Sequence, residues 1–546
     1  MGNLSIRRVS VILLVLVLVQ SFFLLAKGGL QIHQHEVDTL HLIDILVRMH
    51  GGEIPHLDFM TPIGVLAFAP VVIFMKAGLS VGMALMAAQV LIAMLLFPAV
   101  IYIIRSRMTG WIALGFGVAV FTLILSLIHG GTGDVTSVSM HYNRWAWAVA
   151  FLVITVGFLP VQRNGSDLAD GVIAGLGFAI LALIKVTYFA AFALPVALGF
   201  LLRRQYKALV VSVISGLLVA LIVTLLAGVS FWQAYLDDLL TVARSDLRPF
   251  PGVSFGEVIS SPAYLAGSAC LMLAVMLLRK AGQAQAGLLL LTLAPGFFYV
   301  TWQNYGNDPQ WLLLVPLLIA MRLPQVPEDA VLWQWKLRDM LRVTVIFAIA
   351  LMVPGFVNLA NSPLRHLLSD RAEFGPLAAG DARYDDVFLA TARLENVEYI
   401  GDLYLGEAFP VNQSDDDEGA IVLNDEVLEA CNLSVGVPAL QGAMTAALTD
   451  GGIGEDARIF VADLSSSIWL YGPFEPVPGA APWQYGDLAG LENATHLMVP
   501  LCPTLLRARK FTLEGIAARG VTLDEVQRNN LFILFEMQHP AGGAAG

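Results

Sequence analysis

Long apolar runs fill much of the first 360 residues and constrain the fold more than any other feature of the sequence. An α-helix needs roughly 20 apolar residues to cross the hydrocarbon core of a bilayer. Taking each such window as one crossing, we expect about eleven transmembrane helices, the first over residues 9–28 and the others beginning near residues 83, 108, 144, 168, 187, 207, 262, 284, 309 and 340. The pattern predicts a polytopic α-helical membrane protein.

The composition agrees with a membrane protein. Of the 546 residues, 57% are hydrophobic and 14% are charged, which is too apolar for a soluble fold of this size. The net charge of −12 argues against a nucleic-acid partner. The first apolar run, Val9 to Ala26, follows Arg7 and Arg8 and lacks a small-x-small cleavage site. We therefore interpret it as an uncleaved helix and not as a signal peptide.

The basic residues predict the orientation of the chain. The segment Pro62 to Leu79 is apolar but short and is interrupted by proline and glycine, so it could be a span or a shallow hairpin at the interface. If it does not cross, the basic clusters share one side of the membrane, as the positive-inside rule requires; these are Arg7/Arg8, Arg105/Arg107, Arg163, Arg203/Arg204/Lys207, Arg279/Lys280 and Arg322 to Arg342. We expect a bacterial inner-membrane protein with a cytoplasmic N-terminus, and outer loops at residues 29–82, 129–143, 230–262 and 301–308.

The chain is expected to divide into a transmembrane domain, residues 1–360, and a soluble periplasmic domain, residues 361–546. The second part has short strand-like pieces such as "RIFVADL" and "HLMVPL" and a helical "FTLEGIAARG", which together indicate an α/β domain. Cys431 and Cys502 would pair in an oxidising compartment or remain free, and both alternatives stay open. Cys270 lies in an apolar run and is expected to fill space there.

The first outer loop carries an amphipathic segment, Asp38 to His50, which is expected to form a helix lying on the membrane. Glu36 and Asp38 stand at its N-terminal end, where carboxylates interact favourably with the helix dipole. In one interpretation they only cap this helix. In the other, one of them is a general base or metal ligand that faces a substrate reaching this depth from the bilayer.

The second outer loop, "HGGTGDVTSVSMHYNRW", holds the acid Asp134, followed by His141, Asn143 and Arg144. A basic residue at the outer end of a helix runs against the topological trend, so Arg144 should have a partner. It would be either a structural arginine or a phosphate contact, for which a forked guanidinium is well suited.

Two further positions place polar groups at the outer ends of spans. "TWQNYGNDPQW" puts Asn304 and Asp308 beside aromatic residues, an arrangement that suits either an aromatic belt or a sugar or pyrophosphate ligand. Lys185, in "LIKVTYF", would either snorkel to the interface or bind phosphate.

The order of these motifs resembles the GT-C superfamily of membrane glycosyltransferases, which includes protein mannosyltransferases and the aminoarabinose transferases of lipid A. The resemblance rests on the acidic outer loop, on a G-x-x-P-x-x-D-F turn that contains Asp58, on the Pro62 and Gly64 hairpin, on the basic turn "RSRM" and on the single acid Asp134. It implies a first acid at Glu36 or Asp38, with Val37 between them where the family commonly has adjacent acids. It implies a second acid at Asp134 and an open alternative in which Glu36 and Asp134 bind a divalent metal, Mg²⁺ or Mn²⁺.

The resemblance implies transfer of a sugar from a polyprenyl-phosphate donor to a lipid, glycan or protein acceptor at the periplasmic face. Glu36 or Asp38 would be the base and Asp134 a second acid. Asp58, His141, Asn143, Arg144, Lys185, Asn304 and Asp308 would contact substrate. The alternatives are a catalytically silent membrane scaffold and a lipid or polysaccharide transporter; a transporter would carry ionisable residues buried in mid-span, and the spans are nearly free of them.

Overall fold

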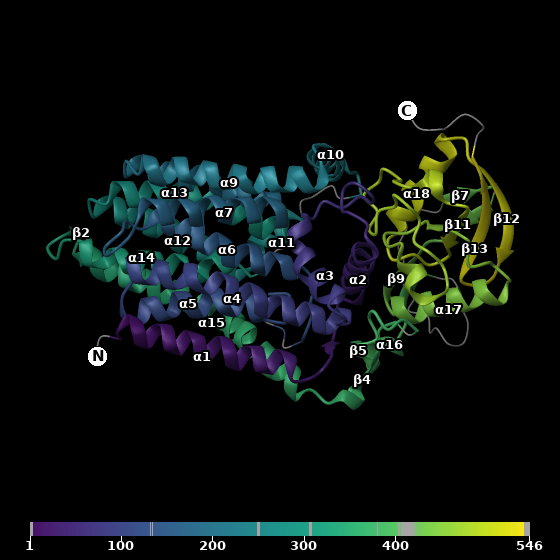
Figure 1. Cartoon of the computed structure of the whole chain (residues 1–546), viewed down its shortest axis with the longest axis horizontal. Coiled ribbons are helices and arrows are strands. Elements are labelled where there is room, and N and C mark those ends of the chain that lie inside the picture. Colours follow the sequence, from purple (N-terminus) through teal and green to yellow (C-terminus); the bar gives the residue numbers. More distant parts are fainter. Residues whose placement is uncertain are drawn as a thin grey trace.

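The computed structural model describes residues 4–130, 133, 135–247, 252–304, 308–378, 380–401, 405, 421–424 and 426–539. A bundle of long helices forms one end of the molecule and an α/β region forms the other (Figure 1). The N-terminus lies at the end of the bundle that is distant from the α/β region, as Figure 1 also shows. This arrangement confirms the predicted fold class, a helical membrane protein with a C-terminal α/β part.

Each apolar run predicted to cross the membrane forms a helix. Seven helices in the described part are long and apolar enough to span a bilayer: α1 (Ile6–Leu25), α4 (Val81–Arg107), α7 (Asp167–Ile184), α9 (Tyr206–Ala227), α12 (Pro262–Lys280), α13 (Ala284–Gln303) and α15 (Leu337–Leu368). The other predicted runs form α5 (Gly110–Leu125), α6 (His141–Phe158), α8 (Val186–Leu202) and the helical residues 310–325, which comprise η2 (Gln310–Leu313), α14 (Val315–Arg322) and η3 (Leu323–Gln325). The chain is therefore a multi-pass membrane protein.

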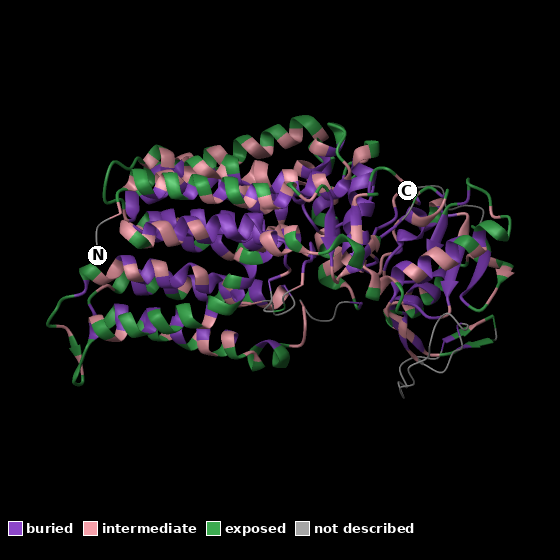
Figure 2. Ribbon diagram, turned by 90° about the horizontal axis from the view of Figure 1, so that it is seen from below, coloured by how far each residue is buried: buried purple, intermediate pink, exposed green. Residues whose placement is uncertain are grey.

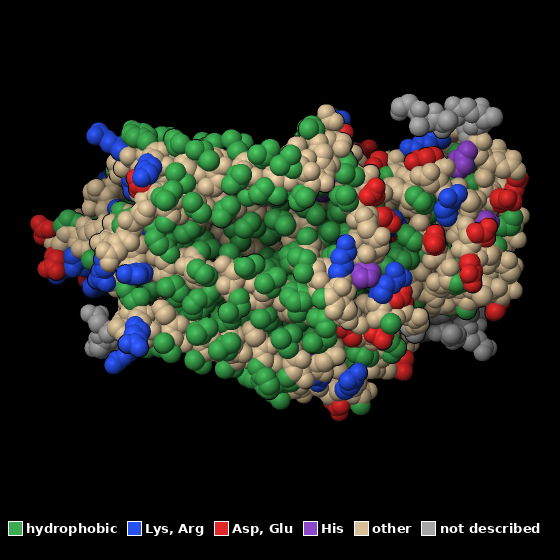
Figure 3. All heavy atoms as spheres, viewed as in Figure 1, with side chains coloured by type: hydrophobic (Ala, Val, Ile, Leu, Met, Phe, Trp, Pro, Cys, Tyr) green, Lys and Arg blue, Asp and Glu red, His purple; other side chains and the backbone are tan. Residues whose placement is uncertain are grey.

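The outer surface of the bundle matches a lipid environment. A wide band of hydrophobic side chains covers the helices on the face shown in Figure 3, and Lys and Arg side chains gather at the end of the bundle away from the α/β region. Helix α9 is the clearest case, since Leu217, Leu225 and Leu226 are 63%, 76% and 81% exposed. Such exposure is unfavourable in water and favourable against lipid tails.

The apolar segment in the second half of the first outer loop does not cross. It forms η1 (Val65–Ala67) and α3 (Ala69–Lys76), and the eight residues of α3 are too few to span the hydrocarbon core. The interfacial hairpin, which was one of the two possibilities for Pro62 to Leu79, is thus the one that forms. As a result, the predicted outer loops gather at the same end of the bundle as the α/β region, together with α10 (Ser230–Arg244) and α11 (Phe255–Ser260) (Figure 1).

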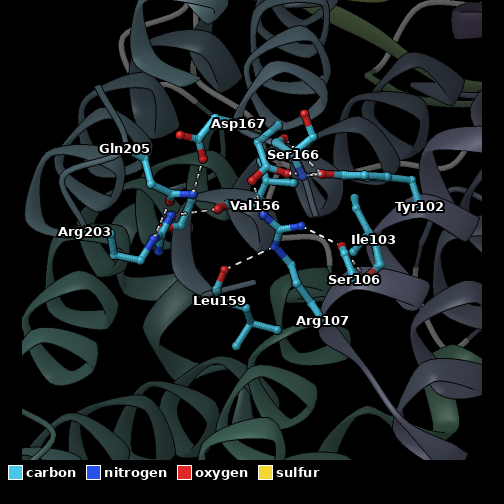
Figure 4. A network of polar contacts seen from close by, with 12 residues as sticks. Tyr102, Ile103, Ser106, Arg107, Val156, Leu159, Ser166, Asp167, Arg203 and Gln205 are labelled. Atoms are coloured by element: carbon cyan, nitrogen blue, oxygen red, sulfur yellow. Dashed lines mark hydrogen bonds and ion pairs between the residues drawn. The ribbon is translucent and has the colours of Figure 1, made fainter. Parts of the chain in front are cut away.

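At the opposite end of the bundle, buried charges join four helices (Figure 4). Arg107 of α4 donates to Asp170 of α7, and both side chains are fully buried. Tyr102 also donates to Asp170, at 2.8 Å, and Arg203, at the end of α8, donates to the carbonyls that end α6. A buried ion pair survives only when its remaining groups are hydrogen-bonded, and this pair is. The network fixes α4, α6, α7 and α8 to one another.

The α/β region is built on a four-stranded sheet in the order β10 (Ile459–Val461), β11 (His496–Pro500), β13 (Phe532–Gln538), β12 (Thr522–Arg528). β10 and β11 are parallel, and the other pairs are antiparallel. Two separate strand pairs are β6 (Glu398–Gly401) with β9 (Cys431–Val435) and β7 (Ile421–Leu423) with β8 (Glu426–Leu428). The longer helices are α17 (Val437–Asp450) and α18 (Leu506–Ala518). Cys431 and Cys502 form a disulfide, so the paired alternative is the one that the structure adopts.

The two parts of the chain share a small sheet. β1 (Leu30–Ile32), from the first outer loop, pairs in parallel with β5 (Val387–Ala390), which pairs in turn with β4 (Phe374–Pro376). α15 continues to Leu368, past the expected domain boundary at residue 360, before this sheet begins. Buried residues run without a break from the bundle through this junction into the α/β region (Figure 2).

The predicted amphipathic helix forms, as α2 (Glu36–Gly51), but its expected position on the membrane surface is wrong. Eleven of its sixteen residues are buried, because α2 lies between the bundle and the α/β region (Figure 1). The polar pair Asp44 and Arg48 faces protein instead of water: Arg48 donates to Asp44 at 2.7 Å, and Trp469 of the α/β region donates to the same carboxylate at 2.9 Å. A second layer of protein therefore covers the polar face of the helix.

Candidate functional site

Glu36 forms an ion pair with Arg393 across the junction between the helical bundle and the α/β region. Its carboxylate accepts from both nitrogens of one side of the Arg393 guanidinium, at 2.8 and 3.0 Å, and the residue is 2% exposed. Arg393 lies on α16 (Thr391–Leu394), directly after β5. A bidentate guanidinium–carboxylate contact of this kind is strong and geometrically specific. Glu36 therefore anchors the start of α2 to the α/β region.

Asp38 has a different environment. It is half-buried, and its carboxylate accepts a hydrogen bond from the hydroxyl of Ser139 in the second outer loop. The residue before the helix is His35, whose φ of +65° is left-handed and whose side chain makes no capping hydrogen bond. Both acids lie in the first turn of α2, which is where the helix-capping interpretation places them.

Three hydroxyl groups fasten the second outer loop to the first. Thr136 bonds the ring of His33 at 2.7 Å, and the hydroxyl of Ser137 lies 2.9 Å from Nδ1 of His35. Ser139 continues the series with Asp38. Because hydroxyl groups both donate and accept, this row can hold neutral imidazoles and a carboxylate side by side.

Two imidazoles face each other beside these acids. The ring centroids of His35 and His129 are 4.9 Å apart. Burial lowers the pKa of His129 to about 4, and burial also lowers the pKa of His35. At neutral pH both rings are therefore uncharged.

Asp134 lies outside the described residues, but its neighbour is located. The carbonyl of Gly133 accepts from the side-chain amide of Asn358 on α15, at 2.5 Å. The outer half of α15 thus supports the loop that carries the second predicted acid.

Three of the predicted binding residues come together around Lys185, at the turn between α7 and α8. Its ammonium donates to the amide oxygens of Asn143 at 3.2 Å and of Asn304 at 2.6 Å, and it lies 5.6 Å from the centre of the Tyr142 ring. Asn304 in turn donates to the hydroxyl of Tyr188 at 3.0 Å. Two amide oxygens and an aromatic face are thus among the groups that position the ammonium.

Arg144 and His141 bind the protein backbone. Arg144 is 1% exposed and donates to the carbonyls of Ser126 and Ile128, just after the end of α5. His141 contacts the carbonyl of Ala67, in η1, through Nε2 at 2.9 Å. Of the two interpretations of Arg144, these contacts are those of the structural arginine.

The last two predicted acids have separate positions. Asp58 is exposed, and its carboxylate accepts from the backbone N–H of Ile54 at 2.6 Å, which closes a turn. Asp308 is half-buried beside α15, where a Cβ on Gly355 would lie 2.3 Å from its carboxylate oxygen. Burial raises the pKa of Asp308 to about 6, so near neutral pH this carboxyl exchanges a proton readily.

A polar stripe on α15, which the sequence reasoning missed, orders both outer loops. Asn358 contacts Gly133, Ser362 accepts from the N–H of Leu127 at 2.8 Å, and His366 accepts from the N–H of Gln31 at 3.1 Å. The three residues are four apart and therefore share one helix face. This spacing, in the last apolar run, is a signal that could have identified them.

The acidic and cationic halves of the site are close together in the chain. Ser139, which contacts Asp38, precedes Asn143, which contacts Lys185, by four residues. Four residues span at most about 14 Å even when fully extended, and less at the start of a helix such as α6. The candidate site therefore combines a carboxylate, neutral imidazoles and an ammonium at the edge of the apolar band.

The described part of the chain contains only one of the two residues of the metal alternative, Glu36, because Asp134 lies outside it. Both oxygens of Glu36 bind Arg393, which leaves little capacity for a cation. Across the described part of the chain, no group of three or more His, Cys, Asp or Glu side chains is placed to hold a metal ion.

No protein-family model and no curated protein matches the chain. Two solved structures of ArnT from Cupriavidus metallidurans are similar to it over 96% of this chain and 97% of theirs, each with 10% identity. The TM-score is 0.42 for ArnT in the apo state and 0.40 for ArnT bound to undecaprenyl phosphate. ArnT is a GT-C aminoarabinose transferase, the superfamily that the sequence motifs resemble. With TM-scores below 0.5, the chemistry of this chain has to be argued from its own residues.

Proposed function

We propose that this protein transfers a sugar from a polyprenyl-phosphate donor to an acceptor hydroxyl at the outer face of the inner membrane. The observation that carries the proposal is the short segment from Ser139 to Asn143, which contacts Asp38 at one end and Lys185 at the other. A base for the nucleophile and a cation for the leaving phosphate are the two groups that such a transfer requires.

The roles follow from the contacts. The acceptor oxygen attacks the anomeric carbon and its proton passes to Asp38, while the bond between the anomeric carbon and the phosphate oxygen breaks. The charge that develops on the departing polyprenyl phosphate is stabilised by Lys185, which Asn143 and Asn304 hold in position. Asp134 is the second acid, and Glu36 holds the start of α2 in place through its ion pair with Arg393.

The site's location supports a lipid-linked donor. Its residues lie at the ends of α6, α7 and α13, next to the apolar surface of the bundle. A polyprenyl chain could remain in the bilayer while its phosphate reaches Lys185. The proposal includes the predicted orientation, with the N-terminus cytoplasmic and the α/β region periplasmic; the disulfide in that region favours an oxidising compartment.

Replacing the acids one at a time tests this proposal in cells. Asp38→Asn and Asp134→Asn should each remove one glycoconjugate and cause its polyprenyl-linked donor to accumulate, as measured by mass spectrometry of lipid extracts. Asp329→Asn is the matched control, because Asp329 is exposed and lies two residues before β2 (Val331–Leu332), at the end of the bundle away from the α/β region. If lipid-linked sugars and glycans stay unchanged in both acid variants, the transferase proposal is wrong and a scaffold or transporter becomes the better interpretation.

A further inference from the structure

A cavity separate from the candidate site opens where the C-terminal end of α2 meets the α/β region. Its volume is about 640 Å³, and its walls come from residues 47–53 of the bundle and from residues 380–384 and 469–478 of the α/β region. This volume lies within the range of roughly 300–1,000 Å³ that is usual for small-molecule sites. Arg48, in its wall, follows Asp38 by ten residues, which is about 15 Å along a helix.

The floor of the cavity is aromatic and rigid. Trp469 and Tyr384 are 8% and 3% exposed, and their polar atoms are already bonded: Trp469 donates to Asp44 at 2.9 Å, and Tyr384 donates to the carbonyl of Leu470 at 2.7 Å. Arg48 lies over the Trp469 ring at 5.8 Å and donates to the carbonyl of Val477. A floor held in this way needs no rearrangement to receive a ligand.

The rim is polar and carries charges of both signs. Arg383 donates to Asp381, while Glu53 and Glu475 stand on other parts of the wall. Counting Arg48, the wall has two cations and three carboxylates, a net charge of −1. Such a wall does not attract a phosphate or another anion, and its many polar groups do not suit a lipid tail.

We propose that this cavity binds a neutral saccharide of about two to four sugar units, a length that suits the usual volume of such sites. The apolar C–H faces of a sugar ring can pack against the exposed edges of the aromatic floor, and its hydroxyl groups can donate to the rim carboxylates and accept from the exposed guanidinium of Arg383. In combination with the proposed function, the saccharide is a part of the acceptor remote from the reacting hydroxyl. Binding at this cavity would then hold the acceptor in register with Asp38.

Gly51 offers a way to fill the cavity without disturbing its walls. It is the last residue of α2, it lines the cavity, and a Cβ added there meets no atom within 4 Å. Gly51→Trp should therefore occupy the space that a sugar ring would use. Gly442→Trp, on α17, is the matched control, because it also has open space around an added Cβ and lies outside the cavity. Glu475→Gln tests the exposed rim with little risk to folding.

The experiment measures saccharide binding by the full chain in lipid nanodiscs. An array of neutral, sialylated and phosphorylated oligosaccharides that includes maltotriose and chitotriose is screened first, and the strongest neutral ligand is then titrated calorimetrically. We expect neutral glycans to bind, G51W to weaken binding at least tenfold, E475Q to weaken it several-fold, and G442W to leave it unchanged. Absence of neutral-glycan binding, a preference for phosphorylated glycans, or unchanged affinity in G51W would each overturn the proposal.

Failure of this proposal can be distinguished from failure of the proposed function. Asp38→Asn should bind the neutral ligand with the affinity of the wild type, because Asp38 lies outside the cavity. If the saccharide binds and G51W abolishes its binding, but no variant alters lipid-linked sugars, the glycan site stands and the transferase assignment fails. If transfer occurs but no neutral saccharide binds, the transferase assignment stands and the glycan site fails.

Discussion

Glu36 and Asp38 could not be distinguished from the sequence, but their surroundings in the structure differ. Glu36 and Asp38 are two residues apart at the start of one helix, so local pattern gives them the same interpretation. The difference comes from Arg393, which is 357 residues from Glu36 in the chain and makes a charged contact with it. Nothing near either residue in the sequence signals that contact. Asn143, Lys185 and Asn304 could be predicted because each is a polar residue at the outer end of an apolar run.

The ion pair of Glu36 predicts a structural phenotype. Glu36→Gln should lower the free energy of unfolding by about 1–3 kcal/mol, since it removes a charged hydrogen-bonded pair whose Arg393 partner is partly exposed. Transfer activity at a permissive temperature should persist. Thermal melting in detergent measures the loss of stability, and a transfer assay measures the remaining activity. Arg393→Met should reproduce both results, and an E36Q variant with full stability but no activity would show that Glu36 is catalytic.

The lowered pKa of His129 predicts acid sensitivity. The unfolded chain binds a proton at this residue below about pH 6.5, while the folded protein does so only near pH 4. Stability contributed by the neutral ring is therefore present above pH 6.5 and is lost as the pH falls toward 4. The wild-type melting temperature should drop between pH 7 and pH 5, and His129→Asn should reduce that drop. An equal drop in the variant would contradict the lowered pKa.

At the scale of elements, the positions of the helices could be predicted from the sequence, but the parts of the protein that pack against them could not. The pattern of α2 was recognised, but an amphipathic pattern does not reveal whether water, lipid headgroups or another domain meets the polar face. Trp469, which meets Asp44, lies in a distant irregular segment. The same holds for α15. The regular spacing of its polar residues can be seen in the sequence, but the residues of the outer loops that they contact cannot.

The stripe on α15 predicts an effect on the rate of transfer. Asn358→Ala removes the contact with Gly133, beside Asp134, and also the hydrogen bond that Arg365 donates to the amide oxygen of Asn358, and the two losses together should cost about 1–3 kcal/mol of stability. We expect kcat for sugar transfer to fall about tenfold with little change in KM, because misplacing a reacting group slows the chemical step. Ser268→Ala on α12, which removes a hydrogen bond local to its own helix, is the control. Unchanged kcat in N358A would argue against support of the acid by this helix.

At the scale of the whole molecule, the helical bundle, the α/β region and their order were predictable from hydropathy alone. Their junction was not. The parallel pairing of β1 with β5 joins residues 357 positions apart, as in Leu30 with Val387, and short strands of this kind carry no sequence signal for a distant partner. The cavity between α2 and the α/β region depends on that junction and was likewise invisible from the sequence.

The proposed orientation predicts which cysteines an impermeant reagent can reach. Trp333, between β2 (Val331–Leu332) and β3 (Trp335–Lys336), is 84% exposed at the end of the bundle away from the α/β region. In spheroplasts, a membrane-impermeant maleimide should label Glu475→Cys but not Trp333→Cys. After permeabilisation it should label both. Labelling of Trp333→Cys alone in sealed cells would reverse the topology.

The most direct test of the central claim is the rate of sugar transfer by Asp38→Asn, measured in proteoliposomes with a radiolabelled polyprenyl-phosphate sugar and compared with Asp329→Asn. If Asp38 is the base and Lys185 holds the donor, D38N should bind the donor as tightly as the wild type and transfer its sugar roughly 10²–10⁴-fold more slowly, while D329N keeps the wild-type rate. Transfer by D38N at the wild-type rate would contradict the account.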